Sequence, residues 1–124
     1  SEVLVAADFP VNAGGYRSVF QELARRHGDY PIVGLAAHGK VASSALSDLR
    51  LVFFGAGETP MVARKAAAIL ERAPYSPAVL VEAQAALESE LSPFGDAACS
   101  AETRKHLARV LLGRAVSQLV GSKT

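Results

Sequence analysis

Residues 46–60, LSDLRLVFFGAGETP, divide the chain into a front half of strands and a back half of helices. The alternation of its first nine residues places Leu49, Leu51 and Phe53 on one face of an extended strand. The GAG that follows stops the strand. The closing threonine and proline predict a helix start, because threonine caps helices and proline is tolerated at the first helical position.

The residues before this point predict a sheet. The expected strands are residues 3–7, 16–23 and 32–37, in addition to 46–54. The pair Gly14-Gly15 separates the first two strands, and Gly39-Lys40 is the expected turn after the third.

The residues after this point predict three helices. They are expected over residues 61–71, 78–91 and 101 to about 120. Ser76-Pro77 repeats the helix-start signal, Ser100 caps the last helix and Gly121 ends it. Strands followed by a block of helices predict an α+β fold, in which helices cover one face of an antiparallel sheet.

Length and composition limit the class of protein. The 124 residues predict one domain, residues 1–124, and because a strand pattern opens the chain we expect a piece of a longer polypeptide. A net charge of +1 without a basic stripe argues against nucleic-acid binding. Cys99 has no cysteine partner, which favours a reducing compartment and a cytoplasmic location. No apolar run is long enough to insert into a membrane.

Residues 20–33, FQELARRHGDYPIV, hold the densest charge cluster of the chain. Its charged or titratable residues are Glu22, Arg25, Arg26, His27 and Asp29. The cluster has two interpretations, an ion-pair network at a sheet edge or a surface that faces a polar ligand. Spacing alone favours the network, with Asp29 accepting from one of the arginines. Surface pairs stabilise by under ~1 kcal/mol each, so stability alone is a weak reason for the cluster.

Other candidates for chemistry are weak. Residues 55–59 could bind an anion at a helix start, but they lack the lysine of a P-loop and the third glycine of a dinucleotide motif. Cys99 precedes the third helix, where a helix dipole lowers a thiol pKa, but no histidine or aspartate stands at a recognised spacing. The three histidines show no metal-ligand spacing. A free-standing enzyme that uses Cys99 or a histidine is therefore the least favoured reading.

Four motifs in order along the chain resemble the C-terminal domain of the FAD-binding medium subunit of molybdenum hydroxylases, the carbon monoxide dehydrogenase and xanthine dehydrogenase group. They are Phe9-Pro10; Phe20 with Ala24-Arg25-Arg26 and Gly28-Asp29-Tyr30; Ser47-Asp48-Leu49-Arg50-Leu51 with Gly55 and Thr59-Pro60; and Ser100-Ala101-Glu102 with Arg104, Leu107-Ala108 and Arg114-Ala115.

This resemblance implies an α+β fold with an antiparallel sheet of three to four strands followed by three helices packed on one face. It also implies that the domain helps to enclose an FAD that is held mainly by two preceding domains of the same subunit. That flavin takes electrons from iron–sulfur clusters on a partner subunit, while a molybdenum-cofactor subunit performs the hydroxylation. On this basis Arg25, Arg26, Gly28 and Asp29 are the expected cofactor-binding residues.

The chain departs from the family pattern at two positions. Glu22 stands where many relatives have a lysine near the flavin, and Thr103 stands where a tyrosine is common. A carboxylate near the flavin would oppose its anionic reduced form. Nothing in the chain resembles the FAD pyrophosphate loop, so we expect this piece by itself to bind FAD weakly or not at all and to be inactive.

The alternative function is a non-catalytic dimerisation or structural module. The mainly apolar third helix could then supply an interface between two copies.

Overall fold

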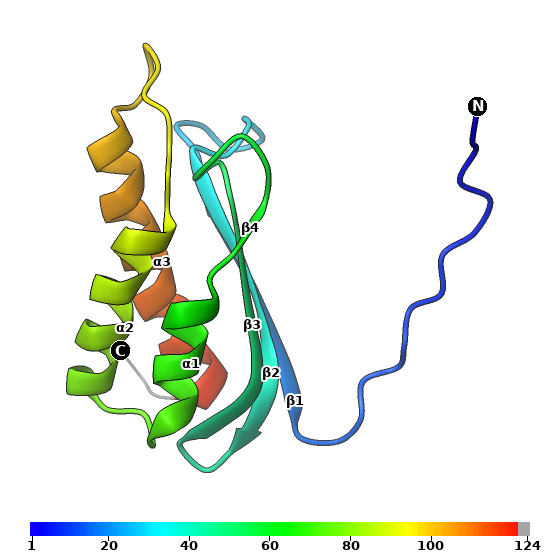
Figure 1. Ribbon diagram of the computed structural model, residues 1–124, viewed down its shortest axis with the longest axis vertical. Coiled ribbons are helices and arrows are strands. Elements are labelled where there is room, and N and C mark those ends of the chain that lie inside the picture. Colours follow the sequence, from blue (N-terminus) through cyan, green and yellow to red (C-terminus); the bar gives the residue numbers. More distant parts are fainter. Residues whose placement is uncertain (122–124) are drawn as a thin grey trace.

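The computed structural model describes residues 1–121, and a four-stranded antiparallel sheet forms its centre (Figure 1). The strands follow the order β1-β2-β3-β4 across the sheet. Their bounds are Tyr16–Leu23 for β1, Val33–Ala42 for β2, Ala45–Phe54 for β3 and Met61–Val62 for β4. The strand predicted over residues 16–23 is confirmed at both ends.

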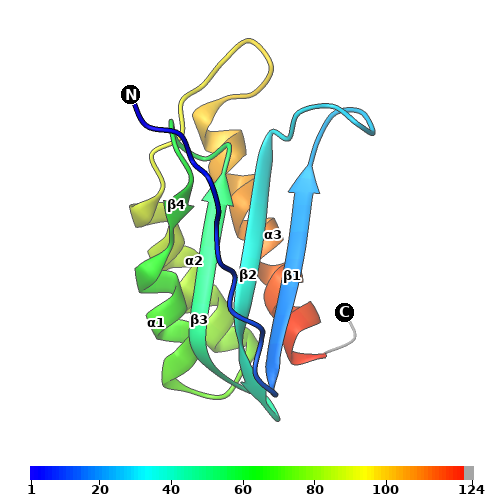
Figure 2. The same cartoon turned by 90° about the vertical axis from the view of Figure 1, so that its right-hand side faces the viewer.

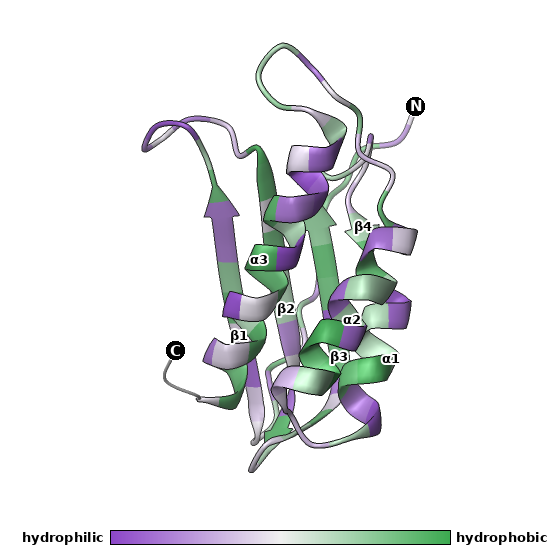
Figure 3. Cartoon of the chain, turned by 90° about the vertical axis from the view of Figure 1, so that its left-hand side faces the viewer, coloured by the Kyte–Doolittle hydropathy of each residue, from purple (hydrophilic) through white to green (hydrophobic). Residues whose placement is uncertain are grey.

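Three helices cover one face of this sheet (Figure 1). They are α1 (Arg64–Arg72), α2 (Pro77–Glu90) and α3 (Ala101–Val120). Helix α3 lies along β1 and β2, α1 lies along β3, and α2 packs mainly on α1 and α3. Figure 3 looks onto this helix layer, where hydrophobic and hydrophilic segments alternate along each helix. The predicted α+β fold, with helices on one face only, is confirmed.

The core lies between the sheet and the helices. Leu49, Leu51 and Phe53 point into it as their spacing predicts, and Leu51 and Phe53 are fully buried. The buried side chains of α3 include Leu111, Leu112, Ala115, Val116 and Leu119. Because the core uses these residues, α3 does not offer them to a second copy of the chain. The interface proposed for this helix as a dimerisation module is therefore not available.

The sequence-predicted turn at Gly39-Lys40 is wrong, because both residues lie inside β2. The chain reverses instead at the two residues after β2, where Ser43 has a φ of 56°. Gly39 occupies an irregularity between the pairs His38↔Arg50 and Lys40↔Ser47. A Cβ there would lie 3.2 Å from Leu49 Cα, so glycine serves a close approach between strands and not a turn.

The helix predicted over residues 61–71 begins later, at Arg64. Met61 and Val62 instead extend the sheet by pairing with Phe53 and Val52. The N-cap residue Ala63 makes no side-chain cap. The threonine-proline signal at 59–60 therefore marks the loop before β4, and the proposed anion site at residues 55–59 loses the helix start on which it depended.

Glu90, from the end of α2, caps α1 in place of a local residue. Its carboxylate oxygens accept from the backbone N–H groups of Lys65 at 2.8 Å and Ala66 at 3.1 Å. These amides have no partner within their own helix, and the helix dipole favours a negative charge beside them.

We expect Glu90→Ala to lower the free energy of unfolding by about 1–2 kcal/mol, because two amides at the start of α1 lose their acceptor. Urea denaturation of the chain measures this effect. Glu82→Ala is the matched control on the same helix, since Glu82 forms only an exposed ion pair with Arg72, worth under ~1 kcal/mol. Equal effects of the two substitutions would contradict the capping role.

The strand predicted over residues 3–7 is also wrong. Residues 1–13 have no regular secondary structure and are exposed throughout. Val5 is 91% exposed and Phe9 is 86% exposed. A strand requires a neighbour that pairs with its backbone, and the described chain offers none to this segment.

Candidate functional site

The loop between β1 and β2, residues 24–32, carries all four of the expected cofactor-binding residues. Ile32 N–H donates to Leu23 O at 2.7 Å and closes the loop. Within it Asp29 N–H donates to Arg26 O at 3.1 Å, which forms a tight turn. Gly28 lies inside this turn with a φ of +82°, a conformation that glycine adopts without steric cost. Gly28 thus shapes the backbone that presents the neighbouring side chains.

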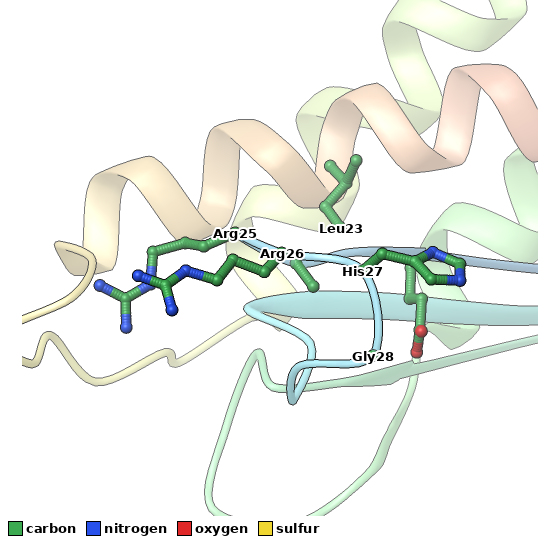
Figure 4. Close-up of a pocket in the computed structure, with 7 residues that line it drawn as sticks. Leu23, Arg25, Arg26, His27 and Gly28 are labelled. Atoms are coloured by element: carbon green, nitrogen blue, oxygen red, sulfur yellow. The ribbon is translucent and has the colours of Figure 1, made fainter.

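The arginines of this loop extend into solvent. Arg25 and Arg26 are exposed and point in the same direction, while His27 points to the opposite side of the loop (Figure 4). Within residues 1–121 no ion pair involves Arg25, Arg26 or Asp29, whose carboxylate Oδ1 accepts instead from Tyr30 N–H at 2.9 Å. The ion-pair network favoured by spacing alone is therefore wrong, and the two guanidinium groups are free to bind an anion.

The loop borders a wide, open hollow of about 580 Å³, lined by residues 22–28. One strand end and one loop form its whole lining, so a ligand placed there would remain mostly uncovered. Two guanidinium groups suit an anionic group such as a phosphate, to which they donate charge-assisted hydrogen bonds, whereas the Glu22 carboxylate on the same lining would oppose an anionic reduced flavin. The residues present therefore fit one side of an FAD site, and the remaining sides would have to come from elsewhere.

Arg104 holds this loop in place from the helix layer. The residue lies on α3 and is 5% exposed. Its Nη1 donates to Ile32 O at 2.6 Å, at the end of the β1–β2 loop, and to Gly55 O at 3.0 Å, at the end of β3. One guanidinium group thus fixes two loops at the same end of the sheet. A Cβ at Gly55 would lie 2.4 Å from Ile32 O, so glycine permits this approach.

Asp96 completes the arrangement from the loop between α2 and α3. Its Oδ2 accepts from Arg104 Nη2 at 2.6 Å, and its Oδ1 accepts from the backbone N–H groups of Ala98 and Cys99 at 2.8 and 2.9 Å. In the sequence Arg104 stands out only as part of a family motif, and Asp96 does not stand out at all. The signal was present, because Arg104 stands four and seven residues before Ala108 and Leu111, on the buried face of α3.

The hydrogen bonds from Ala98 and Cys99 lower the pKa of Asp96, and the positive charge of Arg104 contributes in the same direction. A carboxylate with a lowered folded-state pKa stabilises the fold above its unfolded-state pKa of about 4, and this contribution is lost as the pH falls through the folded-state value. We therefore expect Asp96→Asn to lower stability at pH 7 and the difference from the parent chain to shrink below about pH 4.

Urea denaturation at a series of pH values measures this difference. Asp8→Asn, on the exposed segment before β1, is the control, and we expect it to leave stability at pH 7 unchanged. An Asp96→Asn effect of the same size at every pH would contradict the role assigned to its carboxylate.

Other residues considered for chemistry lie apart from the loop. Cys99 is buried and its thiol contacts Ser100 O at 3.6 Å. His38 lies on β2, stacks on the Tyr16 ring and forms a hydrogen bond between its Nδ1 and Ser18 Oγ at 2.8 Å. In the part of the chain that the structure describes, no cluster of histidine, cysteine and carboxylate side chains is placed to hold a metal ion. None of the described helices is long and apolar enough to cross a membrane.

Residues 18–119 match the sequence model of a family described as the CO dehydrogenase flavoprotein C-terminal domain. The chain belongs to this family. The match begins within β1, at residue 18, and extends through the β1–β2 loop and the other strands to nearly the end of α3, so it leaves out residues 1–17.

Curated and solved proteins agree with this membership. The xanthine dehydrogenase FAD-binding subunit of Escherichia coli O157:H7 is 27% identical over 123 residues, which cover 98% of this chain and 42% of that protein. The reconstituted CO dehydrogenase of Oligotropha carboxidovorans superposes with a TM-score of 0.83 and 25% identity, over 92% of this chain and 40% of that one. A CO dehydrogenase of Hydrogenophaga pseudoflava has the same fold, with a TM-score of 0.84 and 21% identity over 93% of this chain and 40% of that one. The flavoprotein C-terminal domain thus spans about two-fifths of each of these relatives.

Proposed function

We propose that this chain is the C-terminal domain of the FAD-binding subunit of a molybdenum-containing hydroxylase or dehydrogenase. In that subunit it helps to enclose the flavin that relays electrons from iron–sulfur clusters to an acceptor. The observation that carries the proposal is the family match over residues 18–119, in a chain that spans 42% of the FAD-binding subunit it resembles. The redox chemistry belongs to FAD when it is bound, and the domain supplies contacts that orient and shield it.

The proposal assigns the contact with FAD to the β1–β2 loop. Arg25 and Arg26 would donate to anionic groups of the cofactor, Gly28 would allow the turn that presents them, and Asp29 would hold that turn through Tyr30 N–H. Two exposed arginines without ion-pair partners in residues 1–121 support this assignment. The open hollow beside the loop supports the further point that the domain forms only one side of the site.

The partners follow from the same proposal. The preceding FAD-binding domains of the same subunit would hold the pyrophosphate, and subunits with iron–sulfur clusters and a molybdenum cofactor would supply electrons. The single cysteine supports a reducing compartment, and we place the complex in the cytoplasm. The complete enzyme would be an oxidoreductase, with the domain itself inactive.

The test compares the polypeptide of the complete gene with a version that lacks residues 16–121. We expect the complete polypeptide to purify with FAD, and the truncated one to lose FAD on dilution or to leave it open to quenching by iodide. Absorbance and flavin fluorescence report both properties. A complete polypeptide without FAD, or a truncation that changes neither retention nor quenching, would contradict the proposal.

A further inference from the structure

The face of the sheet that points away from the helices is uncovered in the described chain. All three helices lie on the other face (Figure 1). Phe20 from β1 and Phe54 from β3 stack on the open face with ring centroids 5.6 Å apart and an interplanar angle of 15°. Phe20 is nevertheless 65% exposed. A stacked aromatic pair left in solvent is a large apolar surface, and such surfaces mark binding sites.

The sheet is built to hold this aromatic pair in place. Phe54 crosses β2 at Gly34, where a Cβ would lie 1.9 Å from the Phe54 ring. Glycine at position 34 therefore provides the space in which the ring lies flat against the strand. Beside the pair a mainly apolar hollow of about 460 Å³ runs over Ala36 and Val52, with Ser18, His38 and Arg50 at its polar border. The open face thus has an apolar centre and a polar rim, which is the usual composition of a protein interface.

The segment before β1 extends on the same side of the molecule as this face. In Figure 1 it stands clear of the sheet on the side opposite the helices, and Figure 2 shows it running across the front of β2 and β3. Its apolar side chains are as uncovered as the sheet, with Val3 83% and Leu4 87% exposed. Two apolar surfaces that face the same region therefore lack a partner in the described chain.

The direction of the chain indicates what fills this region. The family is that of a C-terminal domain, so in its proteins the additional chain precedes the part matched here. That additional chain is substantial, since the matched part is 42% of the E. coli subunit. The preceding part of the polypeptide would connect to this domain through residues 1–13, which lie on the open side of the sheet. Helix α3, by contrast, ends in the helix layer (Figure 1).

We propose that the open face of the sheet, centred on Phe20, Phe54 and Val52, is the surface on which the preceding FAD-binding part of the same polypeptide docks. This inference rests on the proposed function and adds the surface that joins the two parts. Docking there would bury the aromatic pair, cover the segment of residues 3–11 and leave the β1–β2 loop at the boundary between the parts. Interfaces between domains of one chain are commonly of this mixed polar and apolar kind.

The test places a photo-cross-linking amino acid at position 52 of the complete polypeptide, with position 81 as the matched control. Val81 is a valine that is 62% exposed and lies on α2 in the helix layer, whereas Val52 is half-buried on the open face. Irradiation, digestion and mass spectrometry identify the cross-linked peptides. We expect cross-links from position 52 to residues of the preceding FAD-binding part of the same polypeptide, and a loss of these cross-links when the group is at position 81.

Cross-links from position 52 to a second copy, to another subunit or to nothing would overturn the inference. The FAD content of the same sample separates this result from failure of the proposed function. A polypeptide that binds FAD but does not cross-link upstream retains the function and loses the docking surface, whereas one without FAD loses the function itself.

A second variant checks the surface independently. We expect Val52→Asp in the complete polypeptide to speed proteolytic cleavage within residues 1–13, because a buried carboxylate would weaken docking. Val81→Asp should leave cleavage unchanged. Equal cleavage of the two variants would also overturn the inference.

Discussion

Arg104→Leu is expected to lower the free energy of unfolding by about 3–5 kcal/mol, the largest effect of any single change of a polar side chain in this chain. The substitution removes the donor from Ile32 O and Gly55 O, at the ends of the β1–β2 and β3–β4 loops. Each of these part-buried carbonyls left without a donor costs up to roughly 1–3 kcal/mol. The ion pair with Asp96 is lost as well, although the Asp96 side chain is 41% exposed and regains water. Urea denaturation at pH 7 measures the difference.

Arg109→Leu is the matched control, five residues further along α3. Arg109 forms an exposed ion pair with Glu88, and its side chain is 41% exposed. We expect a loss of under ~1 kcal/mol from this control. Hydrogen exchange adds a second measurement, because Arg104→Leu should speed exchange at Ile32, whose N–H closes the β1–β2 loop. A small stability effect together with unchanged exchange at Ile32 would contradict the anchoring role of Arg104.

The double substitution Arg25→Gln and Arg26→Gln is expected to weaken FAD binding by the complete polypeptide about ten- to a hundredfold. A hydrogen bond to a charged group contributes roughly 1.5–3 kcal/mol, and 1.4 kcal/mol corresponds to a factor of ten in affinity. Both side chains are exposed and free of ion pairs within residues 1–121, so the fold should not depend on them. The variant should therefore lose affinity for FAD at unchanged thermal stability.

The control for this variant is Arg64→Gln with Arg114→Gln, which removes the same charge from exposed positions on α1 and α3. Flavin fluorescence titration gives the dissociation constant for each polypeptide. If both double variants weaken FAD binding equally, the effect is one of net charge and the loop makes no specific contact. If the loop variant binds FAD as the parent does, the assignment of Arg25 and Arg26 is wrong.

Local patterns predicted the elements that depend on one periodicity or one cap. Residues 16–23 alternate between two faces and form β1, and Ser76 and Ser100 each accept from a backbone N–H at a helix start. Gly121 ends α3 in the left-handed conformation, with a φ of 74°. Such signals act within a few residues, so a sequence is enough to read them.

The predictions that failed depend on partners distant in sequence. Residues 61–62 become a strand because β3 offers an edge to them, and α1 is then capped by Glu90, 25 residues from Lys65. Residues 3–7 have strand composition but no strand to pair with. The charge cluster at residues 22–29 spans a strand end and a tight turn, and within residues 1–121 its arginines form no ion pair with its acids.

Only part of the candidate site could be predicted from the sequence, because some of its contacts join residues that are distant in the chain. Family resemblance selected Arg25, Arg26, Gly28 and Asp29, and the structure shows that they share one exposed loop. Spacing alone could not reveal that Arg104, more than 70 residues away from Ile32, fixes the end of that loop. Nor could it show that Phe54 lies over Gly34 and stacks on Phe20, because the alignment of three strands decides this contact.

Photoaffinity labelling of the complete polypeptide tests most directly whether this domain encloses the flavin. The probe is an FAD analogue with an azide on the isoalloxazine ring, bound in the dark, irradiated and then mapped by peptide mass spectrometry. We expect label within residues 16–32, which include β1 and the β1–β2 loop, and suppression of this label by excess FAD. Label that is confined to residues upstream of β1 would show that the domain does not touch the flavin and would contradict the proposed function.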